Sequence, residues 1–162
     1  MSKSEIRDRY RKERQKLSKT QVDLASVEVS KRCIAFLKNR KNIKAVAGYQ
    51  AFDQEIDLSF CFEWCKTEGI SVFLIPKTID PVSEKVQNNI DIWFVPGVVF
   101  SKTHHRLGFG KGIYDQLLSK TTGYKIGIGY QFKGVPEWQS DPWDIPMDHL
   151  ILGEVPFFDH QF

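Results

Sequence analysis

The chain has 162 residues, of which 41% are hydrophobic and 27% charged, and its formal net charge is +3. This length and composition predict one domain with a core of its own and exclude a disordered chain. The first twenty residues hold eight Lys and Arg against three Asp and Glu, so the other 142 residues carry a net charge of −2. General nucleic-acid-binding proteins are basic over a whole face, and we therefore expect no nucleic-acid partner.

The cysteines and the N-terminus bear on the compartment. The three cysteines, Cys33, Cys61 and Cys65, are odd in number and too few for a disulfide framework, so we expect buried thiols. The N-terminal segment is charged and no long apolar run follows, so neither a signal peptide nor a membrane span is predicted. We expect a cytoplasmic monomer without a membrane partner.

The chain begins with a predicted helix over residues 3–17, whose apolar stripe contains Ile6, Tyr10 and Leu17. Its basic side chains recur at helical spacing near one face. They are Lys3, Arg7, Arg11 and Arg14. Spacing alone leaves two interpretations open: a solvated basic surface helix, or an arm that reaches over a polyphosphate.

Helices and strands alternate along the rest of the chain. A second helix over residues 19–38 has Ser18 as its N-cap, a third is capped by Asp57 or Ser59 and ends before Gly69, and a fourth covers 113–119. The strands are expected at residues 43–51, 70–75, 90–95 and 125–130, with a short last strand near 151–152 and a weakly held tail from Gly153. This pattern predicts an α/β fold, a single three-layer domain over residues 1–162 with a mostly parallel central sheet and helices on both faces.

Residues 95–115 lead from a strand end through a polar loop into a glycine ladder and the start of a helix. Gly108, Gly110 and Gly112 alternate with Phe109 and Lys111, so the backbone can approach a ligand closely. Successive backbone N–H groups in front of a helix form an anion site. The spacing matches neither a P-loop nor a dinucleotide fingerprint. Phosphate binding, with Arg106 and Lys111 supplying charge, is favoured over a simple tight turn.

Two further loops carry polar side chains. Residues 52–57 form a polar loop at the carboxyl end of the first strand, where open α/β sheets bind ligands. Residues 133–146 contain three prolines together with Trp138 and Trp143, which predicts a structured loop. Both tryptophans are expected to pack this loop rather than to cover a ligand.

The chain resembles the 5-formyltetrahydrofolate cyclo-ligase family most specifically in the run Arg106-Leu107-Gly108-Phe109-Gly110-Lys111-Gly112-Ile113-Tyr114-Asp115, preceded by Val95-Pro96-Gly97. Three further matches follow the family's order. They are the basic pair Lys3 and Arg7, the acidic loop 53–57 and the acidic motif 144–148. The resemblance covers nearly the whole chain.

This resemblance implies conversion of 5-formyltetrahydrofolate to 5,10-methenyltetrahydrofolate at the expense of ATP, with magnesium. A formamide oxygen is a poor leaving group, and its phosphorylation allows it to depart as phosphate. The second folate nitrogen then attacks the activated carbon and closes the ring. Such phosphoryl transfer needs alignment and charge neutralisation from the protein.

Site residues follow position by position from the resemblance. It implies Arg106 and Lys111 as catalytic cations and the helix at 1–17 as part of the nucleotide site. The ATP-binding residues would be Lys3, Arg7, Arg106, Leu107, Gly108, Phe109, Gly110, Lys111, Gly112, Ile113 and Tyr114. The reduced folate would be bound by Gln50, Glu55 and Tyr114, with core packing as the alternative for Tyr114. Magnesium would be held by Asp115 and Asp144, whose hard oxygens suit it.

The chain also departs from the family pattern. Ser101 and His104 stand where Asp and Gly are usual, Ile113 replaces the first of two tyrosines, and the connection between Ile75 and Ile90 is short. The alternative function is therefore a shortened family member that binds ATP or folate without this activity, or acts on another formamide-like substrate.

Overall fold

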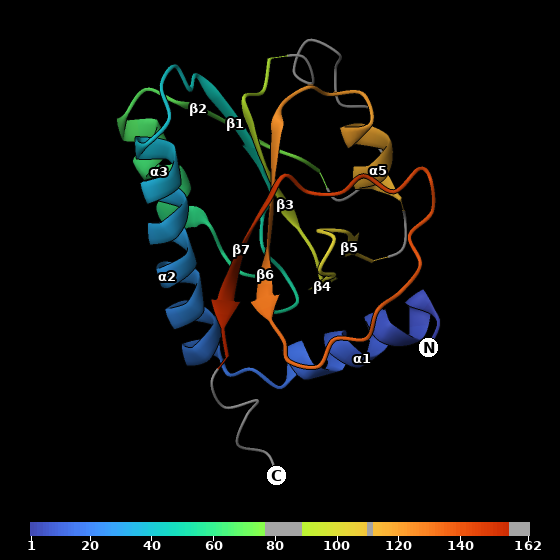
Figure 1. Cartoon of the computed structure of the whole chain (residues 1–162). Coiled ribbons are helices and arrows are strands. Elements are labelled where there is room, and N and C mark those ends of the chain that lie inside the picture. Colours follow the sequence, from blue (N-terminus) through green and yellow to red (C-terminus); the bar gives the residue numbers. More distant parts are fainter. Residues whose placement is uncertain (77–88, 110–111, 156–162) are drawn as a thin grey trace.

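The protein is described by a computed structural model over residues 1–76, 89–109 and 112–155 (Figure 1). Within these ranges five strands form one sheet in the order β2–β1–β3–β6–β7, and all of its pairings are parallel. The strands are β1 (Ala45–Gly48), β2 (Ser71–Leu74), β3 (Ile92–Pro96), β6 (Tyr124–Gln131) and β7 (His149–Glu154). The predicted parallel α/β architecture is confirmed.

Helices cover both faces of this sheet. The helices α2 (Lys19–Lys38) and α3 (Ser59–Thr67) lie on one face and α5 (Ile113–Leu118) lies on the other (Figure 1). Alternate residues of β3 enter two separate cores: Phe94 packs with α2 and α3, and Trp93 packs with α5. This period of two is the consequence of a strand buried on both faces, and the three predicted layers are confirmed.

Local signals in the sequence set the helix ends. Ser18 and Gln21 form a capping box at the start of α2, as the predicted N-cap requires. The predicted cap of α3 by Asp57 or Ser59 was wrong: the N-cap is Leu58, which makes no side-chain cap bond, although Oδ1 of Asp57 accepts from the backbone N–H of Ser59 at 2.9 Å. Gly69 follows α3 with φ +73°, and the N–H of Ile70 donates to the carbonyl of Cys65 at 2.8 Å, which is a Schellman ending.

The first helix, α1 (Lys3–Gln15), packs against a short hairpin rather than lying free in solvent. The hairpin consists of β4 (Val99–Phe100) and β5 (Arg106–Leu107), which pair antiparallel, and it was not predicted. A small core joins Ile6 and Tyr10 of α1 to Val99 and Leu107. Figure 1 shows α1 beside the arrowheads of β6 and β7, at the carboxyl end of the sheet.

Strand order locates the site. The chain runs from β1 outward to β2 and then returns to place β3 on the other side of β1. In parallel α/β sheets this reversal leaves a crevice at the carboxyl ends of the two central strands. The loops that follow β1 and β3 diverge here, and they are the polar loop at 52–57 and the glycine-rich stretch after 95.

The C-terminal end of the sheet differs from the prediction. The weakly held tail does not begin at Gly153, because β7 continues to Glu154 and Gly153 pairs with Tyr130 of β6; that prediction was wrong. Residues 156–162 lie outside the described residues, as do residues 77–88 of the short connection between Ile75 and Ile90.

All three cysteines are buried free thiols, as predicted. No helix in the described part of the chain is long and apolar enough to span a membrane.

Candidate active site

A cleft of about 590 Å³ opens at the carboxyl ends of β1 and β3. Side chains from α1, from the loops after β1 and β3, from α5 and from the loop before β7 all face it. Every described residue that the sequence assigned to the site lines this cleft. They are Lys3, Arg7, Gln50, Glu55, Arg106, Leu107, Gly108, Phe109, Gly112, Ile113, Tyr114, Asp115 and Asp144. Gly110 and Lys111, also assigned to it, lie outside the described residues.

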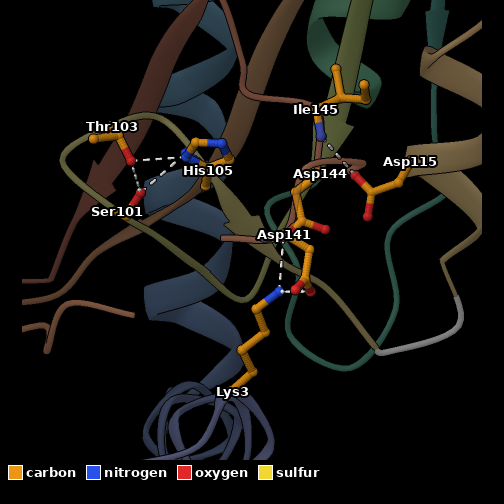
Figure 2. Close-up of polar contacts among 8 residues, drawn as sticks. All are labelled: Lys3, Ser101, Thr103, His105, Asp115, Asp141, Asp144 and Ile145. Carbon is orange, nitrogen blue, oxygen red and sulfur yellow. Dashed lines mark hydrogen bonds and ion pairs between the residues drawn. The ribbon is translucent and has the colours of Figure 1, made fainter. Parts of the chain in front are cut away.

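At one end of the cleft, α1 meets the loop before β7 through an ion-pair cluster (Figure 2). The ammonium of Lys3 donates to Oδ2 of Asp141 at 2.7 Å and to Oδ2 of Asp144 at 2.8 Å. The backbone N–H of Asp141 also donates to Oδ2 of Asp144, at 2.7 Å. Burial acts to raise the pKa of Asp144, but these hydrogen bonds outweigh it and hold that pKa below its ordinary value.

Asp115 lies close to the same loop. Its Oδ1 accepts a hydrogen bond from the backbone N–H of Ile145 at 3.4 Å, so the first turn of α5 is joined to the segment that carries Asp144 (Figure 2). Within the described ranges no cluster of three or more His, Cys, Asp or Glu could hold a metal ion by itself. Two carboxylates in a cleft that is also lined by Lys and Arg fit magnesium, which commonly takes one or two carboxylates and completes its shell with substrate phosphates and water.

Arg106 lines the cleft. Its Nε donates to the carbonyl of Pro96 at 3.0 Å, and its guanidinium carbon lies 5.2 Å from the centroid of the Tyr114 ring. Burial lowers the pKa of Arg106, while the carboxylate of Asp115 acts in the opposite sense. Tyr114 both lines the cleft and packs against the core under α5, so the two interpretations of this residue are compatible.

Arg7 brings a second guanidinium into the cleft from α1. Its Nε is buried and has no hydrogen-bond partner among the described residues. A buried donor without a partner is costly unless a ligand supplies an acceptor. A guanidinium in this state is well suited to a phosphate or carboxylate oxygen.

Glu55 is the buried carboxylate of the cleft, with 6% of its surface exposed. It ends a tight turn in which Asp53 and Gln54 both have positive φ, 52° and 59°. Oε1 of Glu55 accepts from the backbone N–H of Phe52 at 3.1 Å. The phenol of Tyr49 lies nearby, and burial, followed by the charge of Glu55, raises the pKa of Tyr49 well above its ordinary value.

Several cleft residues were not assigned from the sequence. Among them are Arg11, Phe52, Asp141 and Trp143. Helical spacing had placed Arg11 on the same basic face as Lys3 and Arg7, but the resemblance assigned a role only to those two. Trp138 packs its loop against the small core between α1 and the hairpin, as predicted. Trp143, in contrast, is 68% exposed at the cleft rim, and the packing prediction for it was wrong.

The departures at Ser101 and His104 preserve the loop between β4 and β5. Oγ of Ser101 accepts from the backbone N–H of His105 at 3.1 Å (Figure 2), a bond that an aspartate can make equally well. His104 has φ +64°, the conformation that a glycine adopts without cost. Its carbonyl accepts from Met147 N–H at 2.8 Å, which ties this loop to the segment carrying Asp144.

Fold and site together define a parallel α/β protein with a cationic, carboxylate-bearing cleft at the switch point of its sheet. The family model described as the 5-formyltetrahydrofolate cyclo-ligase family matches residues 67–153. The chain is 33% identical to a 5-formyltetrahydrofolate cyclo-ligase of Mycoplasma pneumoniae, over 95% of this chain and 100% of that protein. The chain belongs to the 5-formyltetrahydrofolate cyclo-ligase family.

Solved structures agree in fold. A 5,10-methenyltetrahydrofolate synthetase from Mycoplasma pneumoniae superposes with a TM-score of 0.80 at 30% identity, covering 93% of this chain and 98% of that one. A 5,10-methenyltetrahydrofolate synthetase from Aquifex aeolicus gives a TM-score of 0.76 at 30% identity, covering 94% and 90%. The sequence match to the Mycoplasma pneumoniae protein spans 167 positions and its whole length, so a chain of this size carries the cyclo-ligase name.

Proposed function

We propose that this protein converts 5-formyltetrahydrofolate to 5,10-methenyltetrahydrofolate with ATP, releasing ADP and phosphate. The observation behind the proposal is that residues from four sequence motifs, spread from residue 3 to residue 144, line one cleft. They include every described residue that these motifs assign to the site. Such a convergence is expected of a binding site at a topological switch point.

The phosphates of ATP are assigned to the cationic side of this cleft. Lys3 and Arg7 approach from α1 and Arg106 from β5, with Lys111 as the further cation of the glycine stretch. The backbone around Gly108 and Gly112 gives close access to the phosphate oxygens, since neither residue has a side chain. The guanidinium of Arg7 lines the cleft, so its terminal N–H groups can donate to a phosphate oxygen that enters.

The reduced folate is assigned to the side formed by Gln50, Glu55 and Tyr114. A carboxylate accepts hydrogen bonds from the amino and ring N–H groups of a pterin, and Glu55 is held at the cleft by the turn that precedes it. The ring of Phe52 packs against that of Phe109, with centroids 5.1 Å apart, so an aromatic pair joins the folate side to the ATP-binding glycine stretch. This placement sets the formyl group between the carboxylate side and the cationic side.

The reaction then needs two displacements. The formyl oxygen attacks the terminal phosphorus and ADP leaves. The second folate nitrogen then attacks the formyl carbon and gives up its proton to solvent, and the carbon–oxygen bond breaks to release phosphate. Arg106 and Lys111 neutralise the charge that spreads over the transferred group. Arg106 is suited to this role because Pro96 and Tyr114 hold its guanidinium in place before ligand binds.

Asp115 and Asp144 are the residues that would hold magnesium. When bound, the ion neutralises phosphate charge and orients the terminal phosphate. Asp144 already attracts a cation in this structure, since the ammonium of Lys3 lies 2.8 Å from its Oδ2. Both carboxylates are tied to the same loop, so their spacing is restrained before the nucleotide enters.

The test is the absorbance of the methenyl product, followed with purified protein, 5-formyltetrahydrofolate and Mg-ATP. Wild type should form product only when ATP is present. Arg106→Ala and Asp115→Ala should lower turnover by roughly a hundredfold, as loss of a preorganised charge does. Lys19→Ala and Asp23→Ala remove an exposed surface ion pair on α2 and should leave turnover unchanged. Normal turnover by Arg106→Ala and Asp115→Ala would show that these residue roles are wrong.

A binding protein without the reaction is the alternative, and it is distinguished by ATP-dependent thermal stabilisation without product. It is not favoured, because the Mycoplasma pneumoniae relative is matched over its whole length by a chain of this size. That the protein is a cytoplasmic monomer without nucleic-acid or membrane partners stays a prediction. Analytical ultracentrifugation, and a salt-dependent nucleic-acid binding assay, would test its molecular parts.

A further inference from the structure

Asp53 lies in the turn after β1, outside the set of residues that line the cleft. Its carboxylate accepts hydrogen bonds from three side chains of α1. Nε of Arg11 and Nη2 of Arg14 donate to Oδ2 at 3.3 Å each, and Nε2 of Gln15 donates to Oδ1 at 3.0 Å. Arg14 is 1% exposed, so one of these ion pairs lies inside the protein.

The turn that contains Asp53 is conformationally demanding. Asp53 and Gln54 are consecutive residues other than glycine with positive φ, a geometry that persists only where the surroundings hold it. The carbonyl of Gln54 accepts from the phenol of Tyr130 at 2.7 Å, and the N–H of Glu55 donates to the carbonyl of Phe52 at 3.0 Å. The turn therefore delivers Glu55 to the cleft in one defined position.

Helix α1 contributes side chains both to the cleft and to the contacts that hold Asp53. Lys3, Arg7 and Arg11 of α1 line it, while Arg11, Arg14 and Gln15 hold Asp53. Arg11 also places its guanidinium carbon 4.8 Å from the centroid of the Phe109 ring. A displacement of the Asp53 turn relative to α1 would thus move Glu55 relative to the phosphate-side cations.

We infer that Asp53 is a positioning residue, which fixes the Glu55 carboxylate against α1 and so sets the distance between the folate side and the phosphate side of the cleft. The inference rests on the proposed function for its ligands. The positioning of Glu55 by Asp53, however, is a property of the protein without ligand. Asp53 is anionic at neutral pH: burial acts to raise its pKa, but hydrogen bonds and charges from Gln15, Arg14 and Arg11 outweigh that effect and lower it.

Asp53→Asn is the informative variant, because asparagine tolerates positive φ as aspartate does, while the negative charge is removed. We expect the KM for 5-formyltetrahydrofolate to rise about tenfold, the change expected for loss of charge-assisted hydrogen bonds. The KM for ATP should stay within about twofold of wild type, since the phosphate-side cations are untouched. Backbone amides of residues 54–56 in the free protein should exchange with solvent faster than in wild type.

Asp57→Asn is the matched control. It makes the same chemical change in the same loop, but Asp57 bonds to Ser59 at the start of α3 and has no assigned role in the cleft. It should leave both KM values unchanged. Gln15→Ala removes the neutral donor to Asp53 from an exposed position, and should raise the folate KM in the same direction by less.

The outcomes separate the two proposals. Absence of product with wild-type protein would overturn the proposed function, while the exchange measurement would still test the turn. If wild type turns over and Asp53→Asn has wild-type folate KM and wild-type amide exchange, the inference is wrong. An equal rise in the KM for ATP and for folate would also overturn it, because Asp53 would then support α1 as a whole rather than Glu55.

Discussion

The ammonium of Lys3 lies 2.8 Å from Oδ2 of Asp144, joining residues 141 positions apart in the sequence across one end of the cleft (Figure 2). On the proposed assignments, Lys3 would bind a phosphate of ATP and Asp144 would help to hold magnesium, so both ligands would compete with this ion pair. The ammonium of Lys3 also contacts Asp141 at 2.7 Å, so binding of Mg-ATP would break two contacts of Lys3. We therefore expect the ion pair to disfavour metal binding in the absence of nucleotide.

Lys3→Met should therefore have two opposite effects. Binding of Mn²⁺ alone, measured from the free-ion electron paramagnetic resonance signal, should tighten by roughly threefold, the scale of a partly exposed ion pair. The KM for ATP should rise about tenfold, because a charged donor to phosphate is lost. Lys12→Met, an exposed position on the same helix, should change neither value. Equal Mn²⁺ affinities of wild type and Lys3→Met would contradict the competition.

The acid sensitivity of the fold should depend on Asp53 and Asp144. Both have a pKa below the ordinary value of 3.8, so each ionised carboxylate stabilises the folded state. This contribution is fully present above the ordinary value and is lost as the pH falls through the depressed pKa. The difference in melting temperature between wild type and Asp53→Asn should thus be largest near neutral pH.

Thermal unfolding of both proteins between about pH 6 and pH 2.5 measures this dependence. The two curves should converge at the acid end, where wild-type Asp53 becomes protonated and resembles the asparagine in charge. Asp23→Asn, in an exposed pair with Lys19, should give a curve parallel to wild type. A gap between wild type and Asp53→Asn that widens as the pH falls would disprove the stabilising role of the ionised carboxylate.

Gly129 is so closely packed that the stability of the fold should be sensitive to any side chain at this position. A Cβ added at Gly129 in β6 would lie 2.9 Å from the carbonyl oxygen of Gly97 and 2.9 Å from the Phe100 ring. The backbone cannot yield easily, because Gly97 N–H donates to the carbonyl of Ile128 at 3.1 Å. Gly129→Ala should lower the free energy of unfolding by about 1–3 kcal/mol, as overpacking does. Urea denaturation measures it, and a stability equal to wild type would show that β3 and β6 can separate.

The sequence predicted the main elements of this fold because they are long enough to show periodicity. Helix α2 begins with the predicted Ser18 cap and β3 alternates between two cores. The hairpin β4–β5 was not predicted, because strands of two residues are too short to show alternation of apolar and polar side chains. Arg14 was expected on a basic helix face, and its burial at 1% exposure depends on a partner, Asp53, that only the tertiary fold supplies.

The candidate site was predictable to the extent that its residues lie in motifs. Lys3, Glu55, Arg106 and Asp144 were assigned from such motifs and share the cleft. The roles of residues between the motifs, such as Asp141 and Asp53, depend on side-chain contacts over more than 30 positions along the chain. Sequence spacing holds no information about such contacts, because they are created by the order of the strands.

Trp143 should report ligand binding through its fluorescence, because its ring is 68% exposed at the rim of the cleft. The other tryptophans lie elsewhere. Trp93 is buried and donates to Thr121 at 3.0 Å, and Trp138 packs against the core between α1 and the hairpin. Trp64 lies on α3, on the sheet face opposite to α5. Titration with ATP should change the emission of wild type and of Trp64→Phe, because residues 141–144 lie at the end of the cleft proposed for the nucleotide. Trp143→Phe should keep the wild-type melting temperature, since exposed substitutions change stability by only about 0.5 kcal/mol, and should lose most of the fluorescence change. A full response in Trp143→Phe would show that bound ATP lies away from the rim formed by residues 141–144, because the emission change would then come from a more buried tryptophan.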